Sequence, residues 1–129
     1  MQLNKWKKFP ISNTIKLLFK SHKYDEVVRF MDTALNHRYI PTSDAASYYL
    51  RSLTLTKQYE KAELFWTIDT GRYGVQFNTH FYNSVFFLYC YQYNWYMSNS
   101  VLQLMKEMDV PTEDWTLTSS FKTHLMLGH

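Results

Sequence analysis

Residues that make tight turns or cross-links are scarce in this sequence: its 129 residues include 3 glycines, 3 prolines and 1 cysteine. An all-β sandwich needs many tight turns, so the shortage of glycine and proline argues against that class. The single cysteine, Cys90, excludes a disulfide framework within the chain and a thiolate-rich zinc site, and it indicates a reducing or redox-neutral compartment. The length fits one compact domain or three to four short repeats.

Catalytic and metal-binding motifs are also missing. There is no glycine-rich phosphate loop or nucleophile elbow, and Cys90 lies in an aromatic stretch where a thiol is usually inert packing. The five histidines lack the i, i+4 spacing of a metal-binding helix. They are His22, His37, His80, His124 and His129. The sequence therefore predicts a protein that is not an enzyme and that uses no cofactor or metal ion.

Long hydrophobic runs are absent as well. Between Arg72 and Lys106 the chain has no Asp, Glu, Lys or Arg. The most apolar part of this stretch, residues 85–91, is far shorter than the roughly 20 residues that a membrane-spanning helix requires. Polar side chains interrupt any longer window. We therefore expect buried helices here and no membrane span.

Positive charge is concentrated at the N-terminal end. Residues 1–24 contain six lysines and no acidic residue, whereas the rest of the chain has more acidic than basic side chains, and the net charge of the whole is only +3. The basic segment has three interpretations: a mitochondrial targeting sequence, a patch that faces RNA phosphates, or a solvated helix face. Targeting sequences are usually rich in Arg and Ser, and this segment is not.

Aromatic residues are abundant, with 11 Tyr, 9 Phe and 4 Trp, and they recur with a period. An aromatic residue, a short linker and then a helix-like apolar pattern occur three times. The equivalent positions Val27, Ala62 and Ser98 are about 35 residues apart. An apolar run at helical spacing precedes each segment, at residues 11–21, 45–56 and 81–92. Each unit is therefore predicted to form helix, turn, helix.

Local signals for helix ends agree with this interpretation. Ser43 and Thr112 stand before acidic residues, as helix N-caps do, and Gly71 and Gly74 stand where a second helix should end. A single helical hairpin cannot bury its apolar faces, so neighbouring hairpins must share a core, and most aromatic residues are expected to fill the seams between them.

The fold prediction is accordingly all-α: an α-solenoid of helix-turn-helix hairpins with a period of about 35 residues and about three and a half repeats. The whole chain, 1–129, forms one array. Its repeats lie near residues 8–42, 43–78, 79–113 and, in part, 114–129.

The repeat resembles the pentatricopeptide repeat. Units of that family open with a Thr-Tyr-Asn-like triplet, which residues 81–83 (Phe-Tyr-Asn) match, and they carry a small residue at the twentieth position, which Ala62 and Ser98 match. Residues 40–42 and 110–112 match the closing turn. The tetratricopeptide repeat, with a period of about 34 residues, is the nearest alternative and binds peptides, but its Trp/Leu/Gly/Tyr pattern is not found here.

The resemblance implies a way of binding RNA. Proteins of this family bind single-stranded RNA with one base per repeat, and the fifth and last residues of a repeat read the base edge. The pairs in this sequence are Ser12 with Thr42, Ser47 with Asn78, and Asn83 with Glu113 (Thr112 if the turn slips by one). The second positions, implied to stack on bases, hold Phe9, His80 and Trp115, with Asp44 at the remaining one.

Two hypotheses about function follow. The first is an RNA-binding protein that acts on mitochondrial transcripts in their processing, stability or translation, with single-stranded RNA and a mitochondrial ribonucleoprotein or ribosome as partners. Its phosphate-binding candidates are Lys16, Lys20 and Lys23. The second is a protein-interaction α-solenoid, either tetratricopeptide-like or associated with the mitochondrial ribosome. The first expects the base-reading residues and these lysines on one concave face, and the second expects that face to be apolar or acidic. Ser and Asn near helix starts are also common caps, so a purely structural role stays open for Ser47 and Asn83.

Overall fold

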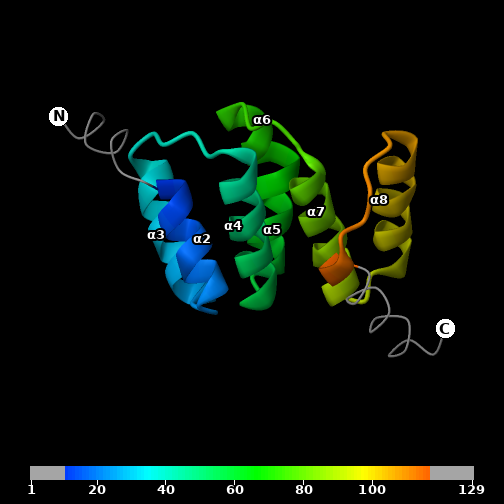
Figure 1. The fold of residues 1–129 in the computed structure, drawn as a ribbon, viewed down its shortest axis with the longest axis horizontal. Helices are drawn as coiled ribbons and strands as arrows, with labels where there is room; N and C mark the ends of the chain where they lie inside the picture. Colours follow the sequence, from blue (N-terminus) through cyan, green and yellow to red (C-terminus); the bar gives the residue numbers. More distant parts are fainter. Residues whose placement is uncertain (1–10, 117–129) are drawn as a thin grey trace.

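The computed structural model describes residues 11–116, and all regular structure in that part of the chain is helical. This part of the chain has seven α-helices, which pack as successive hairpins joined by short turns (Figure 1). The hairpins are α2 (Ile11–Lys20) with α3 (Tyr24–Asn36), α4 (Ser43–Leu55) with α5 (Tyr59–Leu64), and α7 (Thr79–Tyr91) with α8 (Trp95–Glu107). Helix α5 continues through the π-helical turn η1 (Phe65–Asp69) into α6 (Thr70–Tyr73). The all-α prediction is confirmed.

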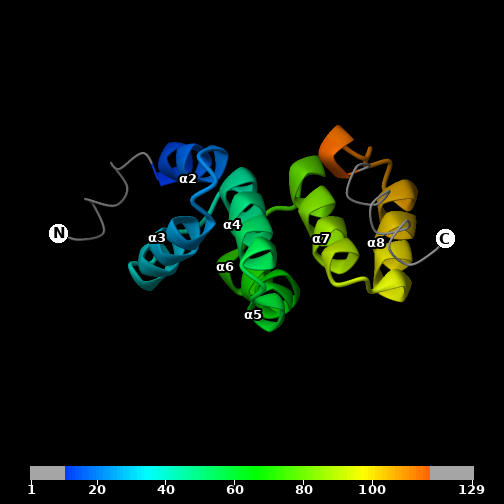
Figure 2. The same ribbon diagram turned by 90° about the horizontal axis from the view of Figure 1, so that it is seen from below.

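The first helices of successive hairpins lie along one side of the protein. Helix α4 packs on α2 before it and, over a longer contact, on α7 after it. Figure 2 shows α2, α4 and α7 along one side, with α3, α5 and α6 along the other. We call these sides the first-helix face and the second-helix face. Helix α4 is consequently buried on most of its circumference, and its buried residues include Ala46, Tyr49 and Leu53.

The helices end in a recurring way. One or two residues after the end of each main helix stands a residue with left-handed backbone geometry. The N–H group of the next residue bonds to a carbonyl group five residues earlier, as in a Schellman motif. Within the hairpins these left-handed residues are His22 (φ 60°), Lys57 (φ 62°) and Tyr93 (φ 57°). After the hairpins they are Arg38 (φ 65°), Gly74 (φ 73°) and Asp109 (φ 56°). The corresponding bonds include Lys23 N–H to Leu18 O (3.0 Å), Gln58 N–H to Leu53 O (2.8 Å) and Asn94 N–H to Tyr89 O (2.9 Å).

The π-helical turn η1 accommodates one extra residue in the middle hairpin. Lys57 and Gly74 are one residue further apart than the matching left-handed residues of the other two hairpins. A π-bulge inserts a single residue into an α-helix. The buried positions change spacing at the same place: they are Ser98, Val101 and Met105 in α8, and Ala62, Phe65 and Thr70 in the segment that contains η1. The bulge therefore keeps both ends of this longer helix facing the core.

Tyrosines at the seams between hairpins account for part of the aromatic excess. On α4, Tyr49 is buried and its hydroxyl donates to the Asp32 carboxylate on α3 (2.6 Å). On α7, Tyr89 is buried in the same way, donates to the Glu63 carboxylate (2.7 Å) and accepts from Trp66 Nε1 (3.1 Å). Burial, with the bond to Glu63, raises the pKa of Tyr89 to about 12. These rings fill the seam, and their polar tips find a carboxylate at its edge.

The two described glycines differ in role, since Gly74 ends α6 in left-handed geometry whereas Gly71 lies inside α6 and does not end it. A Cβ atom added at either position meets no atom within 4 Å. Gly74→Ala should therefore lower the free energy of unfolding by about 1 kcal/mol through backbone strain alone. Gly71→Ala should raise it by about 0.5–1 kcal/mol because alanine is the better helix former. Urea denaturation of the two variants measures both changes. If the two free energies of unfolding change in the same direction, the different roles assigned to Gly71 and Gly74 are wrong.

The role of η1 is tested by deleting one residue from it. Removal of Ile68, which is 51 % exposed, should convert the bulge into regular α-helix at a cost below about 1 kcal/mol. Removal of the exposed Gln103 from α8 is the control, because it rotates the buried Met105 by about 100° away from the core. That deletion should cost at least about 3 kcal/mol. Thermal unfolding compares the two, and a similar loss in both would show that η1 does not absorb an insertion.

Candidate nucleic-acid interface

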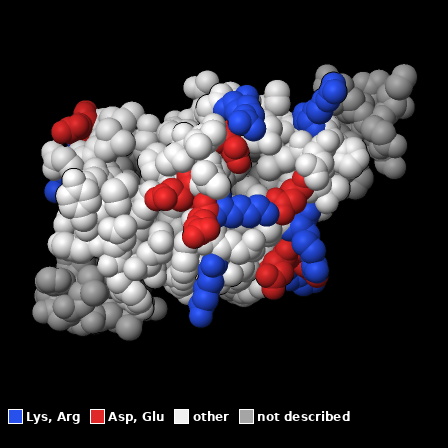
Figure 3. Space-filling model, turned by 180° about the vertical axis from the view of Figure 1, so that it is seen from behind, with Lys and Arg blue, Asp and Glu red and all other residues white. Residues whose placement is uncertain are grey.

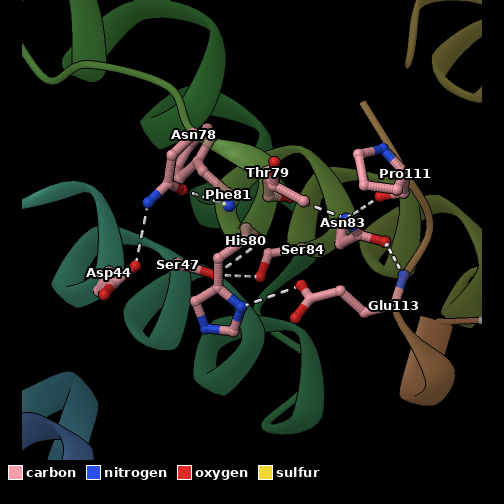
Figure 4. A network of polar contacts seen from close by, with 10 residues as sticks. All are labelled: Asp44, Ser47, Asn78, Thr79, His80, Phe81, Asn83, Ser84, Pro111 and Glu113. Atoms are coloured by element: carbon pink, nitrogen blue, oxygen red, sulfur yellow. Dashed lines mark hydrogen bonds and ion pairs between the residues drawn. The ribbon is translucent and has the colours of Figure 1, made fainter. Parts of the chain in front are cut away.

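The residues that the resemblance implicates for base reading lie near the starts of α2, α4 and α7 and in the segment that follows α8. Around the starts of α4 and α7, polar side chains form a network between hairpins (Figure 4). Thr42 caps α4, with its hydroxyl accepting from Ala45 N–H (3.1 Å), so the cap lies one residue before the expected Ser43. Asn78 caps α7 in the same way, accepting from Phe81 N–H (2.9 Å). Both cap residues have extended backbone geometry, as N-caps require.

The first implied pair is in direct contact. The hydroxyl groups of Ser12 and Thr42 lie 3.1 Å apart, and Ser12 is also 3.1 Å from the Tyr39 hydroxyl. Ser12 is half-buried and Thr42 is exposed. Both hydroxyl groups can rotate, so this pair keeps the capacity to bond to a ligand.

The second pair is separated by its other bonds. Ser47 is fully buried; its hydroxyl donates to His80 O (3.0 Å) and is also hydrogen-bonded to the Ser84 hydroxyl. Ser47 thus ties α4 to α7. Asn78 is exposed, and its amide donates to the Asp44 carboxylate (3.0 Å). Of this pair, only Asn78 presents its side chain to solvent.

The third pair is joined through the backbone. Asn83 is fully buried and donates to Thr79 O (2.8 Å) and Pro111 O (3.0 Å), while its own oxygen accepts from Glu113 N–H (2.9 Å). Both amide protons of Asn83 are used, so only one lone pair of its side-chain oxygen is left to accept a hydrogen bond from a ligand. Asn83 therefore anchors the segment after α8 to α7. Glu113 turns its carboxylate to His80 Nδ1 (3.1 Å).

The stacking candidates are placed unevenly. His80 is half-buried, with edge-to-face contacts to Tyr48 (centroids 5.0 Å apart) and Trp115 (6.4 Å). Trp115 is also half-buried and contacts Phe87 edge-to-face (5.5 Å). Phe9 lies outside the described residues. His80 and Trp115 thus belong to one group of rings on the first-helix face.

The phosphate candidates lie at the N-terminal end of the described chain. Lys16 and Lys20 are exposed and follow Ser12 at steps of four residues, so the three share one side of α2. Lys23 is exposed in the turn before α3. Among residues 11–116, none of these three lysines has an acidic residue within ion-pair distance.

The structure adds one cation that the sequence did not single out. The guanidinium carbon of Arg51, on α4, lies 3.8 Å from the ring centroid of Trp115, 4.5 Å from that of Phe19 and 5.8 Å from that of Phe87. Burial among these rings lowers the pKa of Arg51. A sequence signal did exist, because Arg51 follows Ser47 by four residues just as Lys16 follows Ser12.

Within residues 11–116 there is no cluster of three or more His, Cys, Asp or Glu side chains that could hold a metal ion. None of the helices described has the length and apolarity to cross a membrane.

Comparisons with known proteins do not assign the chain to a family. No family model matches it, and a search of curated proteins finds no match either. The resemblance to pentatricopeptide repeats therefore stays an interpretation of the sequence, and the base-reading roles stay predictions.

Asn83 provides a test of the anchoring network. Asn83→Ala removes three hydrogen bonds and leaves Pro111 O and Glu113 N–H without their partner, so we expect unfolding free energy to fall by about 1–3 kcal/mol. Asn99→Ala, at an exposed position of α8, is the control and should stay within about 0.5 kcal/mol of the parent protein. Chemical denaturation measures both. Equal effects would mean that Asn83 does not anchor the segment.

Proposed function

We propose that the protein binds single-stranded RNA through its first-helix face, as a short α-solenoid. One observation carries the proposal: the cations of α2 and α4 lie on the same face as a group of aromatic rings. Single-stranded nucleic acids are typically bound by this combination, in which cations track the phosphates and rings stack on bases. The cations are Lys16, Lys20 and Arg51, and the half-buried rings are Tyr48, His80 and Trp115. The buried rings of Phe19 and Phe87 support this group from beneath.

The recurring helix ends support the solenoid part of the proposal. The left-handed residues within the hairpins, His22, Lys57 and Tyr93, recur about every 35 residues, the period expected from the sequence. Helices α2, α4 and α7 pack in succession, as first helices of a solenoid do. In this proposal the repeats keep the predicted limits, 8–42, 43–78, 79–113 and 114–129.

The acidic groups on the first-helix face are engaged. Asp44 accepts from Asn78, and Glu113 is paired with His80. Each partner reduces the repulsion that the carboxylate exerts on a phosphate, since a hydrogen-bond donor partly compensates the negative charge locally.

The second-helix face has a different charge pattern. Figure 3 shows Lys, Arg, Asp and Glu side chains intermingled over α3 and α5. The ion pair of Lys61 with Asp32 (2.7 Å) is part of this face. Mixed charges cancel at a distance, so this face offers little attraction for RNA.

The cellular role in the proposal comes from the resemblance. It makes the RNA a mitochondrial transcript and the role its processing, stability or translation, without catalysis by this chain. The lysine-rich start of the chain is consistent with either RNA contact or targeting.

A protein-interaction scaffold is the second candidate, and helix α8 favours it. Its exposed apolar side chains include Tyr96 (79 % exposed), Leu104 (40 %) and, just after the helix, Met108 (50 %). The surrounding sequence has no charged residue from 73 to 105, and the region over α8 is largely uncharged in Figure 3. Exposed apolar patches of this kind often mark protein-binding surfaces.

RNA binding at several salt concentrations tests the primary proposal. Filter binding of a mixed-sequence single-stranded RNA should give an affinity that falls as salt rises, because each phosphate contact releases a counterion. The double variant Lys16→Gln/Lys20→Gln should reduce the slope of log K against log salt by about 1.4. The double variant Lys57→Gln/Lys61→Gln has the same net charge, changes the second hairpin's turn and second-helix face, and should leave the slope unchanged.

Two results would count against RNA binding: no binding by the parent protein, or binding that does not respond to salt. Equal slopes for the two double variants would show that the RNA does not bind at the lysines of the first-helix face.

A further inference from the structure

We propose that Arg51 binds a backbone phosphate of the RNA at the centre of the first-helix face. The inference rests on the proposed function and adds a contact that the resemblance does not assign. Arg51 projects from α4, the middle first helix, and the rings around it come from the helices on both sides and from the segment after α8. These rings are Phe19 on α2, Phe87 on α7 and Trp115. The chain therefore converges on this side chain from parts that are far apart in sequence.

The rings hold the guanidinium group in place without using its hydrogen bonds. A cation over an aromatic ring is attracted by the ring's electron density, and this contact needs no N–H donor. The long side chain of arginine loses rotamer freedom when it is ordered. In Arg51 folding has already imposed that cost, so a ligand binds to a preorganised group.

The donors of Arg51 are unused. Arginine has five N–H donors, and no acceptor among residues 11–116 is bonded to any of them, nor does Arg51 form an ion pair there. Nε is buried and has no hydrogen-bond partner, whereas the two terminal nitrogens are not fully buried. The side chain as a whole is half-buried, so its terminal nitrogens are the donors that a ligand can reach. Two parallel donors with fixed geometry match the oxygens of a phosphate.

The position of Arg51 continues the row of cations on α2. It corresponds to Lys16 of the preceding hairpin, because each follows the fifth-position serine by four residues. A strand of RNA that crosses the first helices in order would meet the lysines of α2 before Arg51 on α4. At α4 the strand would then be held through a backbone phosphate and not through a base. This agrees with the burial of Ser47, which leaves that residue unable to contact a base.

Glu113 is the group that opposes this site. Its carboxylate is near enough to Arg51 to favour the charged guanidinium, and it would repel an incoming phosphate. The pairing of Glu113 with His80 reduces this repulsion. Glu113→Gln should therefore tighten RNA binding, and it leaves intact the backbone N–H that Asn83 holds.

The experiment compares Arg51→Gln with Arg29→Gln, in which an exposed arginine on α3 of the second-helix face is changed. Both variants lose one positive charge. Arg51→Gln should weaken binding of the single-stranded RNA at least about tenfold and lower the salt slope by about 0.7. Arg29→Gln should change neither. Arg51→Lys should keep most of the slope but bind more weakly than the parent, because lysine lacks the paired donors.

The outcomes separate this inference from the proposed function. If the parent protein binds RNA with a salt-dependent affinity and Arg51→Gln equals Arg29→Gln, the inference is overturned and the proposed function stands. A lower melting temperature of Arg51→Gln with an unchanged slope also overturns the inference, since it indicates that Arg51 serves packing alone. If the parent protein does not bind RNA, both fail.

Arginine footprinting of the parent protein gives an answer even if Arg51→Gln does not fold. A dicarbonyl reagent modifies arginines, and mass spectrometry locates the product at each of the four: Arg29, Arg38, Arg51 and Arg72. RNA should protect Arg51 relative to its modification in free protein and should not protect Arg29. Equal protection of the two by RNA, or protection of Arg51 by inorganic phosphate but not by RNA, would overturn the inference.

Discussion

The left-handed residue at the end of each main helix is the constraint on which the arrangement of this protein depends. It closes the helix through a Schellman bond and reverses the chain, so that successive helices lie side by side and the first helices share one face. In the described chain only Gly74 among these residues is a glycine. The others, such as Tyr93 and Asp109, adopt the conformation at a cost of about 1 kcal/mol each. Packing between hairpins must therefore offset that cost, and helix ends and core stabilise each other.

Polar side chains then set how the hairpins meet. Ser47 and Asn83 occupy positions that the resemblance links to bases, yet both are buried and bonded to neighbouring elements. The bonds connect α4 to α7, and α7 to the segment after α8, so the way these elements meet depends on them. The anchored segment after α8 places Trp115 against Arg51 on α4. The polar network and the group of rings around Arg51 are thus built from the same row of helices.

The surfaces of the protein differ in charge. The second-helix face mixes both signs over α3 and α5. The region over α8 is largely uncharged and exposes some apolar side chains. On the first-helix face, Lys16, Lys20 and Arg51 have no ion-pair partner among residues 11–116. Such a division is expected when different faces meet different surroundings, because a cation row attracts phosphate whereas mixed charges remain solvated. The exposed apolar side chains of α8 suit a protein neighbour, so the proposed RNA-binding face and a protein-binding surface would lie on different helices.

The sequence by itself determined the all-α class, the helical hairpins and the places where α4 and α7 begin, because helical periodicity and capping act over a few residues. It misplaced details that depend on one residue, such as the cap at Thr42 and the role of Gly71, and it did not indicate the π-helical insertion in the middle hairpin. Only the tertiary structure decided that Ser47 and Asn83 are buried and that Arg51 lies among rings from three other segments. The physical reason is that burial and long-range contacts depend on the angle between successive hairpins. That angle results from the packing of side chains far apart in the chain, and no local pattern encodes it.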